Sequence, residues 1–356
     1  LCDADATVEL WRLRLTDESR RPRRLALTSY LEWNCGVSPS PRREFHKLFI
    51  ETEFDASRGA VVASGHMWDV ANREYGHWNT SFPYLSAIAG TLAVSAAQGD
   101  KAAFTGRCND LRLPAALPEA QWLPHFGRHE DPIAAMRSSI ELPAGGSCEA
   151  GFVLAMAASR PELYDLLDHY TDVSAIDAAL DRAKASWRDR LATPRVDTPD
   201  DAVNFLANDW VRYQAIAGRL WGRCGYYQQS GAFGFRDQLQ DSQVWLGLDA
   251  RRCREQILLH AGHQFADGSV YHWWHPLTEQ GHITRMTDDL LWLSFVTAAY
   301  LRETGDYSVL QDSAPFLDEG PAPIIEHVRR TFERVFARTS PRGLPYIGAG
   351  DWNDGL

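Results

Sequence analysis

The stretch SSIELPAGGSCEAGFVLAMA, residues 138–157, decides how the first half of the chain folds. Apolar residues alternate with other residues on each side of a Pro-Ala-Gly-Gly turn, and Phe152, Leu154 and Met156 share one face. A period of two is typical of strands that bury one face. The stretch therefore predicts two β-strands that meet at residues 143–146.

The same period recurs toward the N-terminus. In RLALTSYLEWN, residues 24–34, apolar side chains recur at alternate positions between Leu25 and Trp33. HKLFIETEF, residues 46–54, follows a similar pattern. Many short strands separated by turn residues are typical of a large antiparallel β-sandwich. We predict such a domain over residues 1–158.

The period then changes to helical spacing. Apolar residues fall three or four positions apart between Ile176 and Leu191, and Ser174 with Asp177 resembles a capping box. This pattern predicts a helical linker over residues 159–197.

Helical patterns continue over residues 198–356, where Thr198 and Pro199 fit an N-cap and a first helical residue. The apolar stripes are Val203, Leu206, Trp210 and Tyr213 in the first of these helices, and Ile325, Val328, Phe332 and Val335 in the last. Long aromatic, Gly-rich loops precede the later helices. A toroid of helix pairs with its site at one mouth fits this arrangement. Because few helices follow Thr198, we predict an incomplete toroid and a truncated third domain.

Composition limits the classes of function. The formal net charge is −11, which argues against a general binder of nucleic acid or of anionic membranes. Six cysteines lie apart with no CxxC pair, which indicates reduced thiols and a cytoplasmic protein. No apolar run is long enough to span a bilayer. The chain starts without Met and stops inside a Gly-rich loop, so we expect a fragment of a longer protein.

Three loops carry acidic, aromatic and His residues that suit a sugar. They are YYQQSGAFGFRDQLQD, residues 226–241; DGSVYHWWHPLTEQGHITRMTDD, residues 267–289; and SPRGLPYIGAGDWNDG, residues 340–355. Loops of this length inside a compact domain are usually functional. Carboxylates accept hydrogen bonds from vicinal hydroxyls, and Trp offers a stacking plane. We therefore predict one shared cleft for a carbohydrate.

Cleavage of a glycosidic bond needs a proton donor at the leaving oxygen. An inverting hydrolase needs a second carboxylate, about 6.5–9.5 Å away, to activate water. A phosphorolytic enzyme needs no such base, because phosphate is already a nucleophile. It needs a donor, a clamp on the sugar and groups that bind the anion.

Four motifs together resemble the glycoside hydrolase family 94 phosphorylases, once called glycosyltransferase family 36. They are QSGAFGFRDQLQD (229–241), HWWHP (272–276), TRMTDDLLWL (284–293) and GLPYIGAGDWNDG (343–355). The family includes cellobiose and cellobionic acid phosphorylases and the phosphorylase-like module of cyclic β-1,2-glucan synthase. The strands near the N-terminus are similar to its β-sandwich domain, so the resemblance covers essentially the whole chain.

The resemblance implies a β-sandwich, a helical linker and an (α/α)6 barrel, here incomplete. It implies inverting, reversible phosphorolysis of a β-glucoside, a β-linked glucose disaccharide or oligosaccharide, to α-glucose 1-phosphate. Inorganic phosphate is then the co-substrate, and neither an organic cofactor nor a metal is expected. For the full-length protein a homodimer is an expectation. We expect this 356-residue chain to be inactive alone, because much of the family's phosphate site follows the DWND motif.

The resemblance also assigns residues. Asp354, the second Asp of DWND, is the general acid, and Trp352 lines the subsite of the donated sugar. Arg236 and Asp237 hold hydroxyls of that sugar. Apart from the resemblance, Gln240 and Asp241 are interpreted as supports behind this clamp, with Gln240 among the substrate-binding candidates. Asp351 contacts substrate, orients Asp354 or acts as a cap.

Several features have a simpler interpretation. Asp354 could cap a following helix, and Arg236 with Asp237 could form an internal ion pair. His260, His263, His272 and His275 could suggest a metal, but no HExxH or CxxC context supports one. Asp288 and Asp289 are interpreted as first-turn charges that favour a helix dipole. Glu279-Gln280-Gly281 departs from the Gly-Arg-Gly of many relatives, which puts the handling of phosphate or acceptor there in doubt.

Three other functions remain open. The chain could be the phosphorylase-like module of a cyclic β-1,2-glucan synthase. It could be an inverting hydrolase, which would need a base carboxylate. It could also be a non-catalytic carbohydrate-binding fragment.

Overall fold

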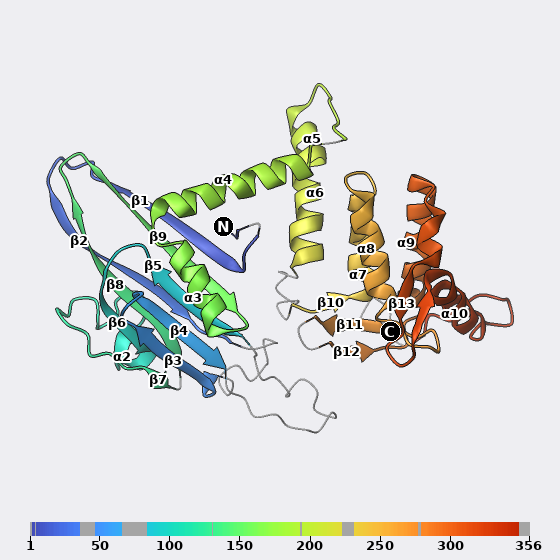
Figure 1. Cartoon of the computed structure of the whole chain (residues 1–356), viewed down its shortest axis with the longest axis horizontal. Coiled ribbons are helices and arrows are strands. Elements are labelled where there is room, and N and C mark those ends of the chain that lie inside the picture. The colour runs from blue at the N-terminus through green and yellow to red at the C-terminus, as the bar shows by residue number, and fades with distance from the viewer. Residues whose placement is uncertain are drawn as a thin grey trace. The chain divides into compact units, whose positions relative to one another are not determined.

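The computed structural model in Figure 1 describes residues 2–3, 5–35, 47–65, 84–129, 131–192, 194–222, 231–276 and 279–348. By its internal contacts the chain divides into two compact units, Leu1–Arg188 and Asp189–Leu356. Within the described ranges, no helix has both the length and the apolar character needed to cross a bilayer.

The first unit is built on two antiparallel sheets. A six-stranded sheet has the order β1-β9-β5-β4-β3-β7, and a three-stranded sheet has the order β2-β8-β6. The strands are β1 (Val8–Thr16), β2 (Arg23–Glu32), β3 (Ile50–Asp55), β4 (Ala60–Gly65), β5 (Leu85–Gly90), β6 (Val94–Asp100), β7 (Gly127–Arg128), β8 (Pro132–Leu142) and β9 (Ser147–Ala157).

The Pro-Ala-Gly-Gly turn joins the two sheets rather than two neighbouring strands. β8 pairs with β2 and β6, whereas β9 pairs with β1 and β5. Gly145 has φ +66°, a conformation that favours glycine, and its N–H donates to the Asp17 carboxylate at 2.8 Å. Asp17 directly follows β1, and its own N–H donates to Gly146 O at 2.9 Å. The turn is therefore fixed to the end of a strand from the larger sheet.

The main core lies between the two sheets. Met136 and Ala134 of the smaller sheet share one buried cluster with Val61 and Ile88 of the larger sheet. Phe152 of β9 packs against the same cluster. This contact accounts for the predicted apolar face of β9, because alternate side chains of a strand point to the same side.

Helices cover the outer faces of both sheets, as Figure 1 shows for the larger one. They are α2 (Lys101–Thr105), α3 (Arg160–His169) and α4 (Val173–Arg190). Leu163 of α3 and Ile176 of α4 are buried against Val153 and Ala155 of β9. Phe104 of α2 packs on the smaller sheet. Strand β9 is therefore buried on both faces. Small side chains alternate with its large ones, so helices can pack closely against its outer face.

Two predicted helix starts are wrong by a few residues. Helix α4 begins at Val173, and the carboxylate of Asp172 accepts from the Ala175 N–H at 3.0 Å, in place of a capping box at Ser174. Helix α5 (Asp201–Phe205) is capped by Asp200 and not by Thr198. In both places an Asp supplies the acceptor, because its carboxylate reaches the free N–H groups of the first turn.

The second unit is mainly helical, with a small sheet of β10 (Phe233–Gly234), β11 (Tyr271–His275) and β12 (Gln280–Ile283). Its helices are α5, a π-helical stretch Leu206–Trp210, α6 (Val211–Tyr213), a second π-helical stretch Gln214–Trp221, α7 (Phe235–Ser242), a 3-10 turn Gln243–Trp245, α8 (Ala250–Ala261), α9 (Thr287–Thr304), a 3-10 turn Tyr307–Gln311 and α10 (Ile324–Phe336). β13 (Ser313–Pro315) pairs with β14 (Pro321–Pro323). Helix α7 packs against α8 and α9, and α9 packs against α10.

Two predicted apolar stripes differ from the buried faces of their helices. Val203, Leu206, Trp210 and Tyr213 lie 39–49% exposed. In α10 the buried residues are Ile324, His327, Thr331 and Val335. Buried polar groups explain the second error, because His327 Nδ1 contacts Gln264 Oε1 at 2.8 Å and Thr331 Oγ1 accepts from Gln264 Nε2 at 2.9 Å. A hydrogen-bonded polar face does not appear in a pattern of apolar residues.

Candidate functional site

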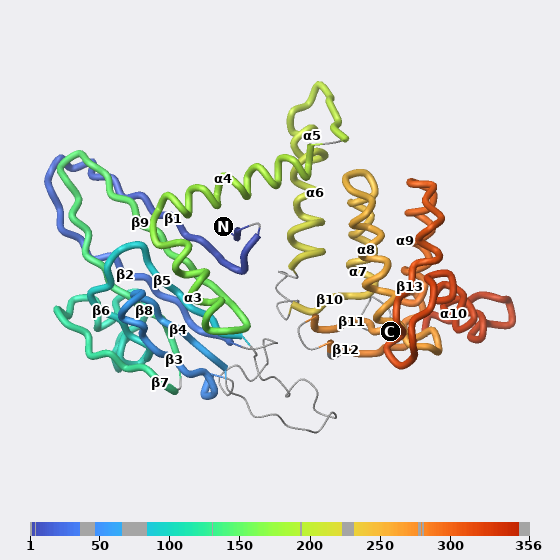
Figure 2. Tube along the Cα trace, viewed as in Figure 1, coloured from blue at the N-terminus to red at the C-terminus, as the bar shows by residue number. Residues whose placement is uncertain are grey.

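The small sheet of the second unit brings the first two long loops together. Phe233 and Gly234, directly before α7, pair with Trp274 and Trp273 of β11. β11 in turn pairs with β12, which leads into α9. The tube in Figure 2 shows these strands beside the ends of α7 and α9. The first turns of both helices therefore form the candidate site.

Arg236 joins the two helix starts. Its Nη1 donates to Asp288 Oδ2 at 2.7 Å, and its guanidinium lies 5.5 Å from the centre of the Trp292 ring. The Arg236 and Asp288 side chains are 27% and 44% exposed, so the pair lies at an accessible surface. Asp288 was interpreted from sequence as a helix-dipole charge only, and its bond to Arg236 is a second role.

The other sequence-predicted residues of α7 lie close by. The Asp237 side chain is 14% exposed, and its Oδ1 is 3.8 Å from Arg219 Nη2. Arg219 Nε donates to Asp241 Oδ2 at 2.8 Å, so one arginine spans both carboxylates. Gln240 is exposed, one turn further along α7.

A buried histidine holds the start of α7 in place. His260 on α8 has edge-to-face ring contacts with Phe235 at 5.4 Å and with Trp274 at 5.2 Å. Its Nδ1 contacts Gln256 O at 2.7 Å, and burial lowers the pKa of His260 to about 3. The ring is therefore neutral at physiological pH and serves as an apolar support.

The third long loop reaches the same place. The Thr287 N–H, at the first residue of α9, donates to Ile347 O at 3.0 Å. Gly348 has φ +92°, and a Cβ built on it would lie 1.7 Å from Arg285 O. Gly348 is the last described residue. Asp351, Trp352 and Asp354 lie outside the described residues, so their roles stay predictions.

We expect Gly348→Ala to displace this loop from α9, because the added methyl group meets backbone that cannot move alone. The left-handed conformation adds strain of about 1–3 kcal/mol. Gly343 is a matched control, since it has φ +77° and nothing within 4 Å of a built Cβ. Thermal unfolding of the two Ala variants should show a larger decrease in Tm for Gly348→Ala than for Gly343→Ala. Equal losses would mean that the close approach does not matter.

A buried contact between a histidine and an aspartate, beside Asp288 in sequence, was missed from sequence. His272 Nδ1 on β11 contacts Asp289 Oδ2 on α9 at 2.7 Å, and the Asp289 side chain is only 2% exposed. The bond to Asp289 raises the pKa of His272, and burial raises the pKa of Asp289. The spacing of residues in the sequence could have indicated that Asp289 is buried, because Asp289 shares a helical face with buried Leu293 and Val296.

The histidines do not form a metal cluster in the part of the chain that the structure describes. His263 Nδ1 contacts Leu259 O and its Nε2 contacts Glu279 Oε2, both at 2.7 Å. Glu279 has φ +55°, a conformation that glycine adopts without strain. The departure Glu279-Gln280-Gly281 therefore coincides with a strained position at Glu279 and with a bond to His263, two residues after the end of α8.

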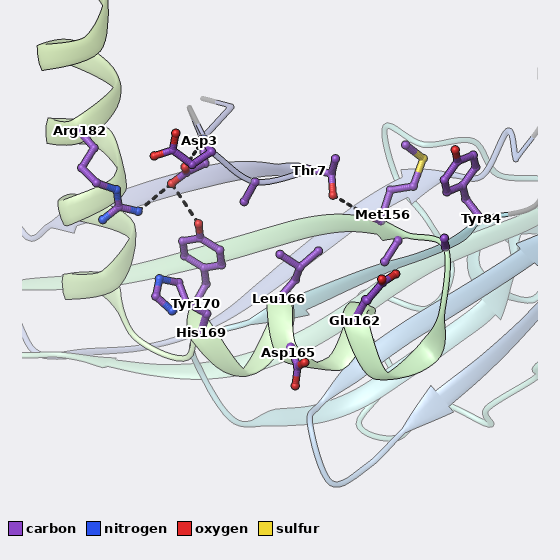
Figure 3. Close-up of a pocket in the computed structure, with 14 residues that line it drawn as sticks. Asp3, Thr7, Tyr84, Met156, Glu162, Asp165, Leu166, His169, Tyr170 and Arg182 are labelled. Atoms are coloured by element: carbon purple, nitrogen blue, oxygen red, sulfur yellow. Dashed lines mark hydrogen bonds and ion pairs between the residues drawn. The ribbon is translucent and has the colours of Figure 1, made fainter. Parts of the chain in front are cut away.

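The first unit has a cavity of about 610 Å³, drawn in Figure 3. It lies between the N-terminal segment and α3, with Met156 and Leu166 on its wall. At one end the buried Asp3 accepts hydrogen bonds from Tyr170 Oη at 3.0 Å and Arg182 Nη2 at 2.8 Å. All its lining residues belong to the first unit, so it does not contain any of the four sequence motifs.

Comparison with known proteins assigns both units. Residues 186–356 match the catalytic domain of the glycosyl hydrolase 94 superfamily, and residues 1–173 match the glycosyl hydrolase 94 supersandwich domain. Over 98% of its length the chain is 32% identical to the cyclic β-(1,2)-glucan synthase NdvB of Rhizobium meliloti, of which it covers 12%. Over 99% of its length it is 26% identical to the solabiose phosphorylase of Paenibacillus borealis, of which it covers 43%.

A solved structure, provisionally named a kojibiose phosphorylase from the human microbiome, has the same fold over 86% of this chain. The TM-score is 0.50, the identity is 9%, and the match covers 41% of that structure. The chain thus spans less than half the length of each of these three proteins. Two adjacent domain matches to one family account for nearly every residue, and the chain belongs to glycoside hydrolase family 94.

Proposed function

We propose that the protein that carries this chain is an inverting glycoside phosphorylase. It would transfer a glucosyl group from a β-linked glucose disaccharide or oligosaccharide to inorganic phosphate and release α-glucose 1-phosphate. The main support is the meeting of three loops at the first turn of α9. Asp288 there binds Arg236, and the Thr287 N–H donates to the carbonyl of Ile347. Ile347 lies four residues before Asp351, where the DWND motif begins.

The proposed chemistry needs one acid. Asp354 would donate its proton to the leaving glycosidic oxygen while phosphate attacks the anomeric carbon from the opposite face. Since phosphate is itself the nucleophile, no base carboxylate, organic cofactor or metal is required. Trp352 would stack on the donated sugar. Asp351 would orient Asp354 or contact the sugar.

Arg236 and Asp237 would hold the donated sugar. Arg236 is a planar donor of several hydrogen bonds, and the Asp237 carboxylate accepts from hydroxyls. Asp288 fixes the Arg236 guanidinium, so the clamp is ordered before sugar arrives. Gln240 and Asp241 would support the clamp from the next turn of α7.

We further propose that the helices from α5 onward are part of an (α/α)6 barrel, with the helical residues 159–197 as a linker. Packed helices α7 to α10 support this arrangement. For the full-length protein we propose a homodimer in the cytoplasm, without nucleic acid or membrane as partner.

An assay of the full-length protein tests the activity. We expect α-glucose 1-phosphate to appear from one member of a panel of β-linked disaccharides, and only when phosphate is present. Release of glucose without phosphate would instead identify a hydrolase. Binding of the sugars with no turnover would identify a carbohydrate-binding scaffold.

A second candidate is the phosphorylase-like module of a cyclic β-1,2-glucan synthase. The identity of 32% to NdvB over 98% of this chain supports it. The same panel separates the two candidates, because this module should prefer β-1,2-linked glucose oligomers. Preference for a β-1,4-linked disaccharide would favour a separate phosphorylase.

A further inference from the structure

We propose that His272 and Asp289 form a charged positioning pair that ties β11 to the first turn of α9 and keeps the candidate site receptive to an anion. The proposal rests on the proposed function for its kinetic consequences. The pair itself rests on geometry alone and can be tested without any activity.

Asp289 connects the first turn of α9 to β11 through its bond to His272. Its carboxylate is buried at the first turn of α9, where backbone N–H groups favour negative charge. Asp289 Oδ2 accepts from His272 at 2.7 Å and from Thr284 Oγ1 at 3.4 Å. Within the described ranges, Asp289 Oδ1 is buried without a hydrogen-bond partner. A carboxylate with so few donors depends strongly on the charge of the one ring beside it.

Charge balance explains what the pair would do. The charged groups that act on His272 are Asp288 and Asp289 from α9 and Asp237 from α7. Arg236 is bound to Asp288 and adjoins Asp237 in sequence. Arg219 lies 3.8 Å from Asp237 and also binds Asp241 at 2.8 Å. With His272 protonated, three cations therefore face four carboxylates. If His272 were neutral, two arginines would face the same four carboxylates, and an incoming phosphate would be repelled more strongly.

The pH range of the pair follows from its two pKa shifts. Hydrogen bonding to Asp289 raises the pKa of His272 above its ordinary value, so the imidazolium persists to higher pH. Burial raises the pKa of Asp289, so the carboxylate gains its proton sooner as pH falls. The charged pair therefore exists between these two pKa values and is lost as pH rises through that of His272.

Two variants separate the bond from the charge. His272→Asn keeps a donor near the position of Nδ1 but cannot carry a proton charge. Asp289→Asn removes the carboxylate that holds the imidazolium. His282→Asn is the matched control, because His282 is exposed on β12 and stacks on Trp273 at 5.6 Å.

Nitrogen-15 NMR of labelled histidines in the full-length protein measures the pair directly. The signal that disappears in His272→Asn identifies His272. We expect its titration midpoint to fall by about one pH unit or more in Asp289→Asn, since an opposite charge at this distance shifts a pKa by about 1–3 units. The midpoint should not change in His282→Asn. An unchanged midpoint in Asp289→Asn would overturn the proposal.

Kinetics with phosphate measure the consequence for the site. An aryl β-glucoside with a readily leaving group needs little proton donation, so its pH profile does not report the general acid. With this substrate, we expect kcat/KM for phosphate in the parent to decline at high pH, as His272 loses its proton. His272→Asn should lose about tenfold or more in kcat/KM for phosphate and should not show this decline. Asp289→Asn should move that decline to lower pH.

Full activity and an unchanged pH profile in His272→Asn would show that the bond alone suffices, and this would overturn the proposal even if the NMR shift were seen. Absence of phosphorolysis in the parent protein would contradict the proposed function. The NMR result would then still decide whether the charged pair exists.

Discussion

Asp354→Asn in the full-length protein should lower phosphorolysis of an unactivated disaccharide by about 10²–10⁴-fold, the usual contribution of general acid catalysis. Asn keeps the size of the side chain but has no proton to give to the leaving oxygen. Because the same sugar contacts remain, KM should change little. Steady-state kinetics with a β-linked disaccharide and phosphate measure both constants.

An aryl β-glucoside provides the control for this variant. Its leaving group needs no proton, so Asp354→Asn should retain most of the parent rate on it. Asp351→Asn should show the same selective rescue if Asp351 only orients Asp354, and it should lose activity on both substrates if Asp351 contacts the sugar. Near-parental turnover of the disaccharide by Asp354→Asn would contradict the assignment and point to Asp351 as the acid.

Asp237→Ala should reduce use of the donated sugar by up to about 10⁴-fold, and it should flatten discrimination among its deoxy analogues. A site built to pair a hydroxyl rejects an analogue that lacks it by about 10⁴–10⁵-fold, because a buried partner is left unpaired. Asp237 lies at the first turn of α7 with a side chain only 14% exposed, which suits such a role. Synthesis from deoxyglucose 1-phosphates measures the discrimination.

Asp249→Ala serves as the comparison. Asp249 is on the loop before α8, where its carboxylate accepts from Arg251 Nε at 3.0 Å, and it contacts neither α7 nor α9 through these bonds. It should leave the ranking of analogues unchanged. If Asp237→Ala also ranks the analogues as the parent does, Asp237 has only the structural role of an ion pair with Arg219.

The sequence by itself determined that the first unit is mainly strands and the second mainly helices, together with the motifs of the site, but it did not indicate α2 or the strands β10 to β14. Periods of two and of three to four are local properties of the chain, so they indicated strands up to residue 157 and helices afterwards. The motif around Arg236 and Asp237 could be found for the same reason, since its residues are neighbours in sequence. Helix starts were misplaced at Ser174 and Thr198, because several residues near a helix start can supply the capping oxygen.

Only the tertiary structure decided which distant residues meet. The turn at residues 143–146 could have joined two paired strands, but packing of two sheets places β8 and β9 in different layers. The buried face of α10 carries His327 and Thr331, because Gln264 from another segment satisfies them. Likewise Asp288 binds Arg236 and Asp289 binds His272 across 52 and 17 positions of sequence. Such contacts depend on distance in space, which the period of a single segment does not contain.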